Sequence, residues 1–185
     1  MSLREKRRHV KIIPPAEIND LGIDHVPQGK KNNWCWVACA AMVLHYREVI
    51  FGRLCDLAST ELHVNPADCC DDLPGGLCDK PASDLKITEV YRHAGIPARR
   101  VGGQVFDTRI VEEIKLPNRA PVELGYSGGF GRGQSGHVVL VVGYQVDDTG
   151  RRSFLISDPL NNAQHAGDID GRWNETWLGL LPQAR

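Results

Sequence analysis

The chain has 185 residues, of which 42% are hydrophobic, and its 22 Lys and Arg residues nearly balance its 23 Asp and Glu residues. This length suits a single domain with a substantial core, and the balanced charge argues against a disordered chain and against general nucleic-acid binding. No apolar run reaches the roughly 18 to 20 residues that a membrane span requires, and the charged N-terminal stretch lacks the apolar run of a signal peptide. We therefore expect one globular domain with no nucleic-acid partner, no membrane span and no Sec-type export signal.

The N-terminal 20 residues differ from the rest of the chain. Basic residues dominate positions 4–11, and two prolines follow before any periodic pattern begins. A basic terminal run of this kind is usually a solvated tail. We expect a basic N-terminal arm over residues 1–20 and a single folded domain over residues 21–185.

Helices are expected in the first half of the domain. Residues 34–47 contain no Gly or Pro and place apolar side chains at helical spacing, and Asn32 and Asn33 offer side chains that cap a helix N-terminus. Residues 65–81, by contrast, combine several Pro and Gly with three cysteines, which predicts a tied-down loop without regular structure. Further helices are expected at 54–62, 83–93 and 107–115.

Strand-like patterns fill the second half. Residues 121–126, 137–145 and 152–156 are short and rich in Val, Leu, Ile and aromatic residues, with turn residues between them. The last two segments are expected to form a hairpin. Helices gathered in the first half (about 21–116) and strands in the second (about 117–185) predict an α+β fold with segregated layers rather than alternating βαβ units.

Cys35 stands at the first turn of the best-defined helix, between Trp34 and Trp36. The unpaired N–H groups and the positive end of the helix dipole favour the thiolate form of a cysteine at this place, and the thiolate is the nucleophilic form. Cys39, one turn later and flanked by alanines, is expected to point inward as a small apolar side chain. Of the two, Cys35 is the candidate nucleophile.

His137 is the candidate general base among the seven histidines. It follows a glycine-rich stretch and begins the apolar run 138–142, so we expect it at the mouth of a strand, held by a rigid sheet. A cysteine–histidine pair also needs a third group that fixes the orientation of the imidazole. We expect Asp158 to do this, because it ends the neighbouring strand of the hairpin and so comes to lie beside the start of the His137 strand.

The glycine-rich stretch 127–136 contains five glycines. It does not fit a phosphate-binding loop, because no Lys-Ser or Lys-Thr follows and the stretch leads into a strand rather than a helix. We expect instead a flap over the cleft beside His137, with a narrow channel that favours small residues next to the cleaved bond.

These motifs resemble those of the papain-like cysteine proteases, and more closely those of the small bacterial members related to double-glycine (bacteriocin-processing) peptidases and to effector proteases. Residues 33–39, Asn-Trp-Cys-Trp-Val-Ala-Cys, are similar to the family's nucleophile segment, and residues 136–144, Gly-His-Val-Val-Leu-Val-Val-Gly-Tyr, to its histidine strand. Asp158 falls where the family has its Asn or Asp. The resemblance implies an N-terminal helical part, with a central nucleophile helix, packed on a C-terminal antiparallel sheet.

The resemblance also implies a mechanism, with no cofactor and no metal. Cys35 would attack a peptide carbonyl, and His137 would transfer the proton. Asp158 would orient His137, while Gln28 and the backbone N–H of Cys35 would stabilise the oxyanion. The stretch from Gln28 to Cys35 departs from that of papain, because it is longer and carries Lys and Asn where papain has small residues and a cysteine.

The expected function is hydrolysis of peptide bonds in a protein or peptide substrate by a cysteine endopeptidase. By analogy with related proteins, we expect a bacterial effector or toxin with an immunity or inhibitor protein as a second partner. It would be secreted into a target cell by a route without a classical signal peptide, and would otherwise be cytoplasmic. The same residues also suit a deamidase or an acyl transferase, and a non-catalytic binding module with this fold is the alternative of another class.

Four further cysteines surround the Pro- and Gly-rich loop. Two disulfides are the simplest interpretation, and because a bond between adjacent Cys69 and Cys70 is strained, one of them pairs with Cys55 and the other with Cys78. A zinc site built from these thiols and His63 is an alternative, as is a fully reduced state in a cytoplasm. The sequence leaves the redox state and the pairing open.

Overall fold

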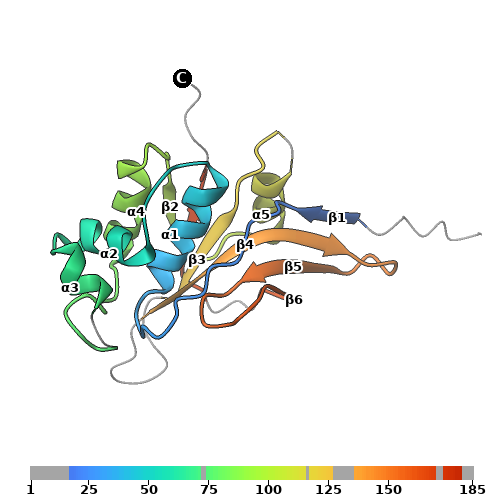
Figure 1. Cartoon of the computed structure of the whole chain (residues 1–185). Coiled ribbons are helices and arrows are strands. Elements are labelled where there is room, and N and C mark those ends of the chain that lie inside the picture. Colours follow the sequence, from blue (N-terminus) through green and yellow to red (C-terminus); the bar gives the residue numbers. More distant parts are fainter. Residues whose placement is uncertain (1–16, 72–73, 116, 127–135, 170–172, 181–185) are drawn as a thin grey trace, which may run out of the picture.

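The computed structural model shows helices packed against one antiparallel sheet (Figure 1). The α+β prediction is confirmed. The structure describes residues 17–71, 74–115, 117–126, 136–169 and 173–180. Most of the predicted basic arm, residues 1–16, and most of the predicted flap, residues 127–135, lie outside the described residues.

Five helices lie in the described part of the chain. They are α1 (Cys35–Tyr46), α2 (Leu54–Leu62), α3 (Pro66–Cys70), α4 (Asp84–His93) and α5 (Asp107–Ile114). Four of them confirm the predicted helices. The exception is α3, which interrupts the predicted loop because Asn65 caps the backbone N–H of Ala67 and Pro66 suits the first turn of a helix. None of these five has the length and apolar character of a membrane span.

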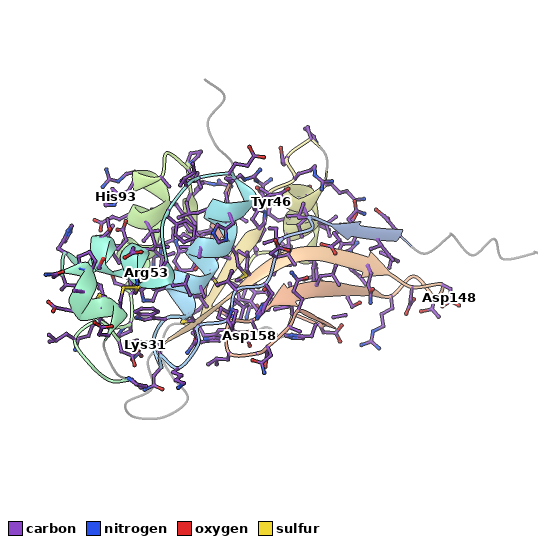
Figure 2. All side chains as sticks on the ribbon, in the orientation of Figure 1. Lys31, Tyr46, Arg53, His93, Asp148 and Asp158 are labelled. Atoms are coloured by element: carbon purple, nitrogen blue, oxygen red, sulfur yellow. A yellow bond between two sulfur atoms is a disulfide. The ribbon has the colours of Figure 1, made fainter. Side chains whose placement is uncertain are left out.

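Helix α1 is the centre of the core. All of its residues from Cys35 to Leu44 are buried, and most of them are Ala, Cys or Val. These small side chains let the helix lie close to the sheet, so that the Cys39 thiol contacts the backbone oxygen of Val138 at 3.7 Å. Side chains fill the space between α1 and the sheet (Figure 2). A helix that is buried on all sides belongs to the middle of a domain, which fixes its N-terminus firmly.

Among the described residues, seven strands form the sheet. They are β1 (Glu17–Asp20), β2 (Arg99–Gly102), β3 (Val122–Tyr126), β4 (His137–Val146), β5 (Arg152–Ser157), β6 (His165–Gly167) and β7 (Glu175–Leu178). The order is β2-β7-β3-β4-β5-β6, with β1 also paired to β4, and all pairs are antiparallel. Strands β3, β4 and β5 confirm the predicted strands, and β4 and β5 form the predicted hairpin.

The helical and strand halves are less separate than the sequence suggested. Strand β1 lies in the segment assigned to the arm, and β2 lies in the half assigned to helices, yet both join the sheet. Strand β1 can reach β4 because residue 143 is Gly, since a Cβ atom there would lie 2.5 Å from the carbonyl oxygen of Asn19. The sheet is therefore built from both halves of the chain.

Candidate active site

Cys35 is the first residue of α1, and its side chain lines a cavity although the residue is only 6% exposed. Trp34 occupies the N-cap position without a side-chain hydrogen bond to the helix, so the prediction that Asn32 or Asn33 caps it is wrong. No acidic side chain lies in the first turn. The N-terminal N–H groups of α1 therefore remain available to stabilise negative charge at Cys35.

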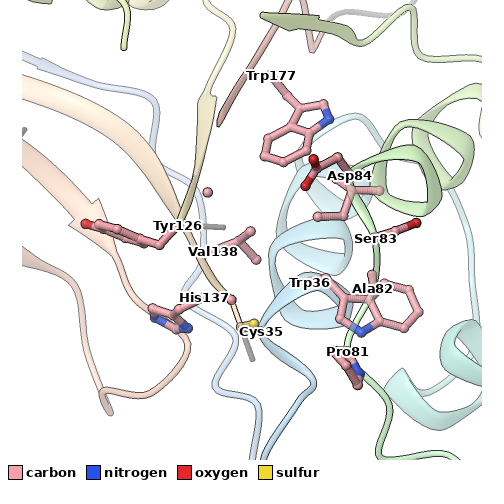
Figure 3. A pocket seen from close by; sticks show the side chains of 13 residues that line it. Cys35, Trp36, Pro81, Ala82, Ser83, Asp84, Tyr126, His137, Val138 and Trp177 are labelled. Carbon is pink, nitrogen blue, oxygen red and sulfur yellow. The ribbon is translucent and has the colours of Figure 1, made fainter. Parts of the chain in front are cut away.

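His137 begins β4 and lines the same cavity as Cys35 (Figure 3). Its Nε2 lies 2.8 Å from Oδ1 of Asp158, which leaves Nδ1 as the ring nitrogen for its interaction with the Cys35 thiol. Burial lowers the pKa of His137, but the hydrogen bonds to Asp158 and Cys35 outweigh it and raise the pKa to about 9. The imidazole is therefore positively charged at neutral pH.

Asp158 directly follows β5, and the antiparallel pairing of β5 with β4 brings it to the start of the His137 strand. Its Oδ1 accepts both the His137 Nε2–H and the backbone N–H of Leu160, at 2.8 and 2.9 Å. Burial raises the pKa of this carboxyl, but the two hydrogen bonds prevail and the pKa is lowered. Asp158 is thus a carboxylate held in place by its own turn.

The structure brings three of the four predicted site residues together. Cys35 comes from a helix start, His137 from a strand start and Asp158 from a strand end. The imidazolium lies between a thiol and a carboxylate, which is the nucleophile–base–orienter arrangement that covalent catalysis by a cysteine requires. The geometry suits acyl transfer from a carbonyl compound to the thiol.

In a comparison with known protein families, residues 20–179 match the family described as the Peptidase_C39 like family. The chain belongs to this Peptidase_C39-like family. The membership confirms the resemblance to papain-like cysteine peptidases related to the double-glycine peptidases. No curated protein matches the chain.

Cys39 of this Peptidase_C39-like protein is placed differently from Cys35. It is fully buried, and its thiol faces the backbone oxygen of Val138. Burial, with a further contribution from nearby Glu123, raises the pKa of the Cys39 thiol well above its usual value. Cys39 is therefore a packing residue that stays protonated, as the sequence predicts.

Gln28, the predicted oxyanion donor, lies in the loop before α1 and is buried. Its backbone N–H donates to the carbonyl of Pro159 at 3.0 Å, so this loop is tied to the turn that carries Asp158. Its side-chain Nε2 donates to the carbonyl of Lys31 at 2.5 Å, and Gln28 is not among the described residues that line the cavity. One hydrogen of the amide remains for another acceptor, and the oxyanion role stays a prediction.

Asp79 was not singled out by the sequence, yet it holds the loop that leads to Cys35. Its buried carboxylate accepts the backbone N–H groups of Asn32, Asn33 and Gly75 at 3.0, 2.8 and 2.6 Å. Burial opposes ionisation, but these hydrogen bonds together lower the pKa of Asp79. Asn32 and Asn33, which the sequence predicts as helix caps, therefore donate their backbone N–H groups to Asp79.

The residues on both sides of Asp79 also hold the start of α1. The indole N–H of Trp34 donates to the carbonyl of Cys78 at 2.7 Å, and that of Trp36 donates to the carbonyl of Lys80 at 3.0 Å. The two tryptophans that bracket Cys35 thus anchor it to the segment 78–80. The sequence marked these tryptophans as part of a motif but gave no sign of their partners.

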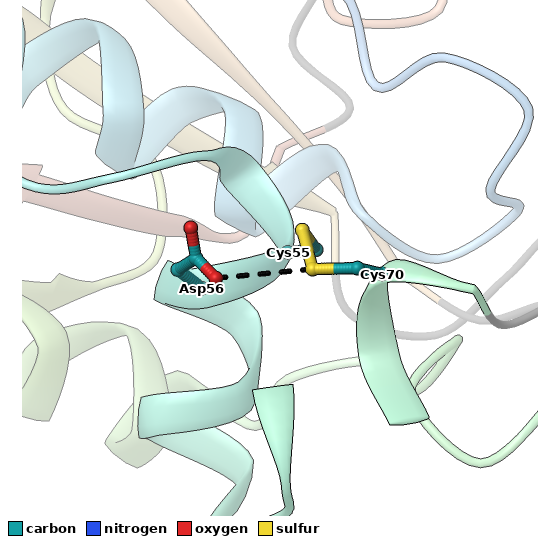
Figure 4. A group of neighbouring side chains, drawn as sticks. All are labelled: Cys55, Asp56 and Cys70. Atoms are coloured by element: carbon teal, nitrogen blue, oxygen red, sulfur yellow. Dashed lines mark hydrogen bonds between the residues drawn. A yellow bond between two sulfur atoms is a disulfide. The ribbon is translucent and has the colours of Figure 1, made fainter. Parts of the chain in front are cut away.

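The remaining four cysteines form two disulfides, Cys55–Cys70 and Cys69–Cys78. This agrees with the preferred interpretation and resolves the pairing. Cys55, Asp56 and Cys70 lie close enough to hold a metal ion, and Cys70 Sγ is 3.8 Å from Asp56 Oδ1 (Figure 4). Because the two sulfur atoms are bonded to each other, neither is a free thiolate, and this group does not fit a zinc site.

Proposed function

We propose that this protein is a cysteine peptidase that hydrolyses peptide bonds of a protein substrate, with Cys35 as the nucleophile, His137 as the proton carrier and Asp158 as the group that orients His137. The observation that carries the proposal is the placement of Cys35 and His137 in one cavity, with Asp158 bonded to the far side of the imidazole. Family membership supports peptidase chemistry at this site.

In the acylation step, the Cys35 sulfur bonds to the scissile carbonyl carbon and the carbonyl oxygen becomes an oxyanion. His137 then gives its proton to the amine, which leaves as the carbon–nitrogen bond breaks, and a thioester remains on Cys35. In the second step, His137 takes a proton from water, whose oxygen attacks the thioester and releases the acid and the thiolate. The bond to Asp158 keeps the ring oriented throughout.

The oxyanion needs donors that lie near Cys35. The backbone N–H of Cys35 is one, because it belongs to the first turn of α1 and has no partner within the helix. The side chain of Gln28 would be the second, using the amide hydrogen that Lys31 does not accept. Its loop is anchored to the Asp158 turn, which supports a position close to the catalytic group.

We also propose that the enzyme is a bacterial effector or toxin, secreted into a target cell and neutralised by an immunity protein that covers the cleft. The two disulfides support only the secretion part of this proposal, because such bonds form and persist in oxidising compartments.

The test of the activity uses two cysteine variants of the same helix. Wild type, Cys35→Ala and Cys39→Ala are each incubated with an extract of bacterial proteins, and new N-termini are identified by mass spectrometry. We expect wild type and Cys39→Ala to produce the same cleavage sites and Cys35→Ala to produce none. Products that have lost an amide or exchanged an acyl group, without a new terminus, would instead identify a deamidase or a transferase.

A further inference from the structure

The cavity beside the candidate catalytic pair has a volume of about 240 Å³ and extends away from the cysteine (Figure 3). Cys35 and His137 lie at one end, and Trp177 and Asp84 lie at the other. Gly125 forms part of the wall, where a Cβ atom would come within 2.9 Å of the Trp177 ring. The cavity is therefore an elongated space that adjoins the nucleophile and is large enough for a long side chain.

Most of the wall is apolar, but the end farthest from Cys35 carries a negative charge. Apart from His137, Asp84 is the only charged residue among the described residues that line the cavity. Asp84 is the first residue of α4, and its carboxylate points into the cavity beside the Trp177 ring (Figure 3). An apolar channel with one acid at its end suits a side chain with an aliphatic stem and a charged tip.

The charge of Asp84 is not neutralised by its surroundings. Its Oδ2 accepts from Arg100 Nη2 at 2.8 Å, but Arg100 Nε also lies 2.8 Å from Glu175 Oε2. Two carboxylates thus share one guanidinium, which leaves an excess negative charge at this end. Within the described residues, Oδ1 of Asp84 accepts no hydrogen bond.

We propose that this cavity binds a lysine or arginine side chain of the substrate, at a position within two residues of the scissile bond, with Asp84 as the specificity-determining residue. The stem packs along Val138, Ile87 and the Trp177 ring, and the cationic head reaches Asp84 Oδ1. The inference deepens the proposed function and rests on it.

An uncharged side chain fits this cavity less well for a physical reason. A leucine or phenylalanine would remove water from Asp84 Oδ1 without replacing its hydrogen bond, and a buried carboxylate oxygen without a donor is unfavourable. A lysine or arginine supplies a charge-assisted hydrogen bond at the same place. The proposed preference for lysine or arginine differs from the preference for small residues next to the cleaved bond that the glycine-rich stretch predicts.

The test compares pairs of substrates that differ only in charge. Peptides around a mapped cleavage site are made with lysine or norleucine, and with arginine or citrulline, at each of the two positions on either side of the scissile bond. At one position we expect kcat/KM to be about tenfold or more higher for the charged member, the size of one charge-assisted hydrogen bond. Equal values for both members of each pair at every position in wild type would overturn the inference.

Two variants assign the effect to Asp84. Asp84→Asn should bring the lysine-to-norleucine ratio close to one, because the lysine peptide loses its charge-assisted hydrogen bond and the norleucine peptide no longer covers an unsatisfied carboxylate oxygen. Asp107→Asn is the matched control, because Asp107 is also the first residue of a helix, is exposed and lies outside this cavity. A ratio that survives in Asp84→Asn, or that falls equally in Asp107→Asn, contradicts the role of Asp84.

A binding measurement separates this inference from the peptidase proposal. In a Cys35→Ala background, fluorescence anisotropy measures without turnover the affinity for labelled alanine-based peptides that carry one lysine or one norleucine and need no mapped cleavage site. If wild type cleaves nothing but Cys35→Ala prefers the lysine peptide and loses this preference with Asp84→Asn, the pocket assignment stands and the peptidase proposal fails. If wild type cleaves peptides but shows no charge preference, the peptidase proposal stands and the pocket assignment fails. If neither cleavage nor a charge preference is found, both proposals fail.

Discussion

At His137, three local interactions decide the protonation state of the proposed catalytic pair. Burial disfavours the imidazolium, while Asp158 and Cys35 favour it, and the balance raises the pKa to about 9. A cation next to a thiol stabilises the thiolate, which is the reactive form. Because the imidazolium is present below this pKa, we expect activity to fall as the pH rises through about 9.

Asp158→Asn tests the contribution of the carboxylate. The amide oxygen can still accept the Nε2–H, but the negative charge is gone, so the pKa of His137 should fall and the alkaline limb of kcat/KM should move to lower pH. We expect activity at neutral pH to drop about ten- to a hundredfold, the size of one hydrogen bond to a charged group. Asp148→Asn, at the far tip of the β4–β5 hairpin (Figure 2), is the matched control. An unchanged alkaline limb in Asp158→Asn would contradict the assignment.

Asp79→Ala tests the anchoring of the loop that leads to Cys35. The change leaves three backbone N–H groups without their acceptor, so we expect a loss of at least about 2 kcal/mol in the free energy of unfolding. Urea denaturation measures this loss, and a peptide assay well below the melting temperature should show a lower kcat because Cys35 is less firmly held. Asp68→Ala, an exposed aspartate of α3, should change neither quantity appreciably. Equal effects of the two variants would argue against the anchoring role.

The helices and strands that the sequence predicts are those whose own residues carry a capping or hydrophobic pattern. Helix α4 begins after Ser83, whose hydroxyl accepts the Lys86 N–H at 3.2 Å, and β4 shows its apolar run directly. Strands β1, β2, β6 and β7 are three or four residues long and carry no pattern of their own, because their conformation comes from their partners. The site shows the same difference between local and long-range signals. Cys35 and His137 each stand at the start of an element, where the local sequence marks them. Asp79 acts on residues more than 40 positions earlier in the chain, which no local pattern reveals.

The two disulfides can be removed one at a time, and the two resulting variants can be compared with each other. The disulfide Cys69–Cys78 ends at the segment 78–80, which anchors Trp34, Trp36 and the loop that leads to Cys35. The disulfide Cys55–Cys70 joins α2 to α3 away from the cavity. Replacing either pair by serines should lower the free energy of unfolding by about 2 to 4 kcal/mol.

Activity should distinguish the two disulfides. Below the melting temperature of both variants, we expect kcat/KM to fall clearly more in the Cys69→Ser, Cys78→Ser protein than in the Cys55→Ser, Cys70→Ser protein. The assay uses one peptide substrate at one temperature. A larger loss in the second protein would show that the segment 78–80 does not depend on its disulfide for its position.

At the scale of the whole molecule, a buried acid makes stability depend on pH. Glu123 on β3 is completely buried, the Tyr91 hydroxyl donates to its Oε2, and its Oε1 has no hydrogen-bond partner among the described residues. Burial raises the pKa of Glu123 to about 8, against the opposing effect of Tyr91. The folded protein therefore holds a proton at Glu123 that the unfolded chain releases at a lower pH.

Glu123→Gln tests this linkage. Between the ordinary carboxyl pKa and about 8, the folded state binds more protons than the unfolded state, so wild-type stability falls as the pH rises through this window. The glutamine variant lacks this contribution, and its stability relative to wild type should improve steadily from pH 5 to pH 8. Urea denaturation of both proteins across this range measures the difference, and a difference independent of pH would contradict the account.

The proposed chemistry depends above all on the pairing of the Cys35 thiol with a charged His137, and the rate of Cys35 alkylation reports on this pairing. Wild type and His137→Ala are treated with iodoacetamide at pH 7 without reductant, and modification is followed at each cysteine by peptide mapping. We expect Cys35 to react rapidly and Cys39 hardly at all, and we expect the removal of His137 to slow the reaction of Cys35 at least about tenfold. A Cys35 rate that is unchanged without His137, or no greater than that of Cys39, would contradict the pairing.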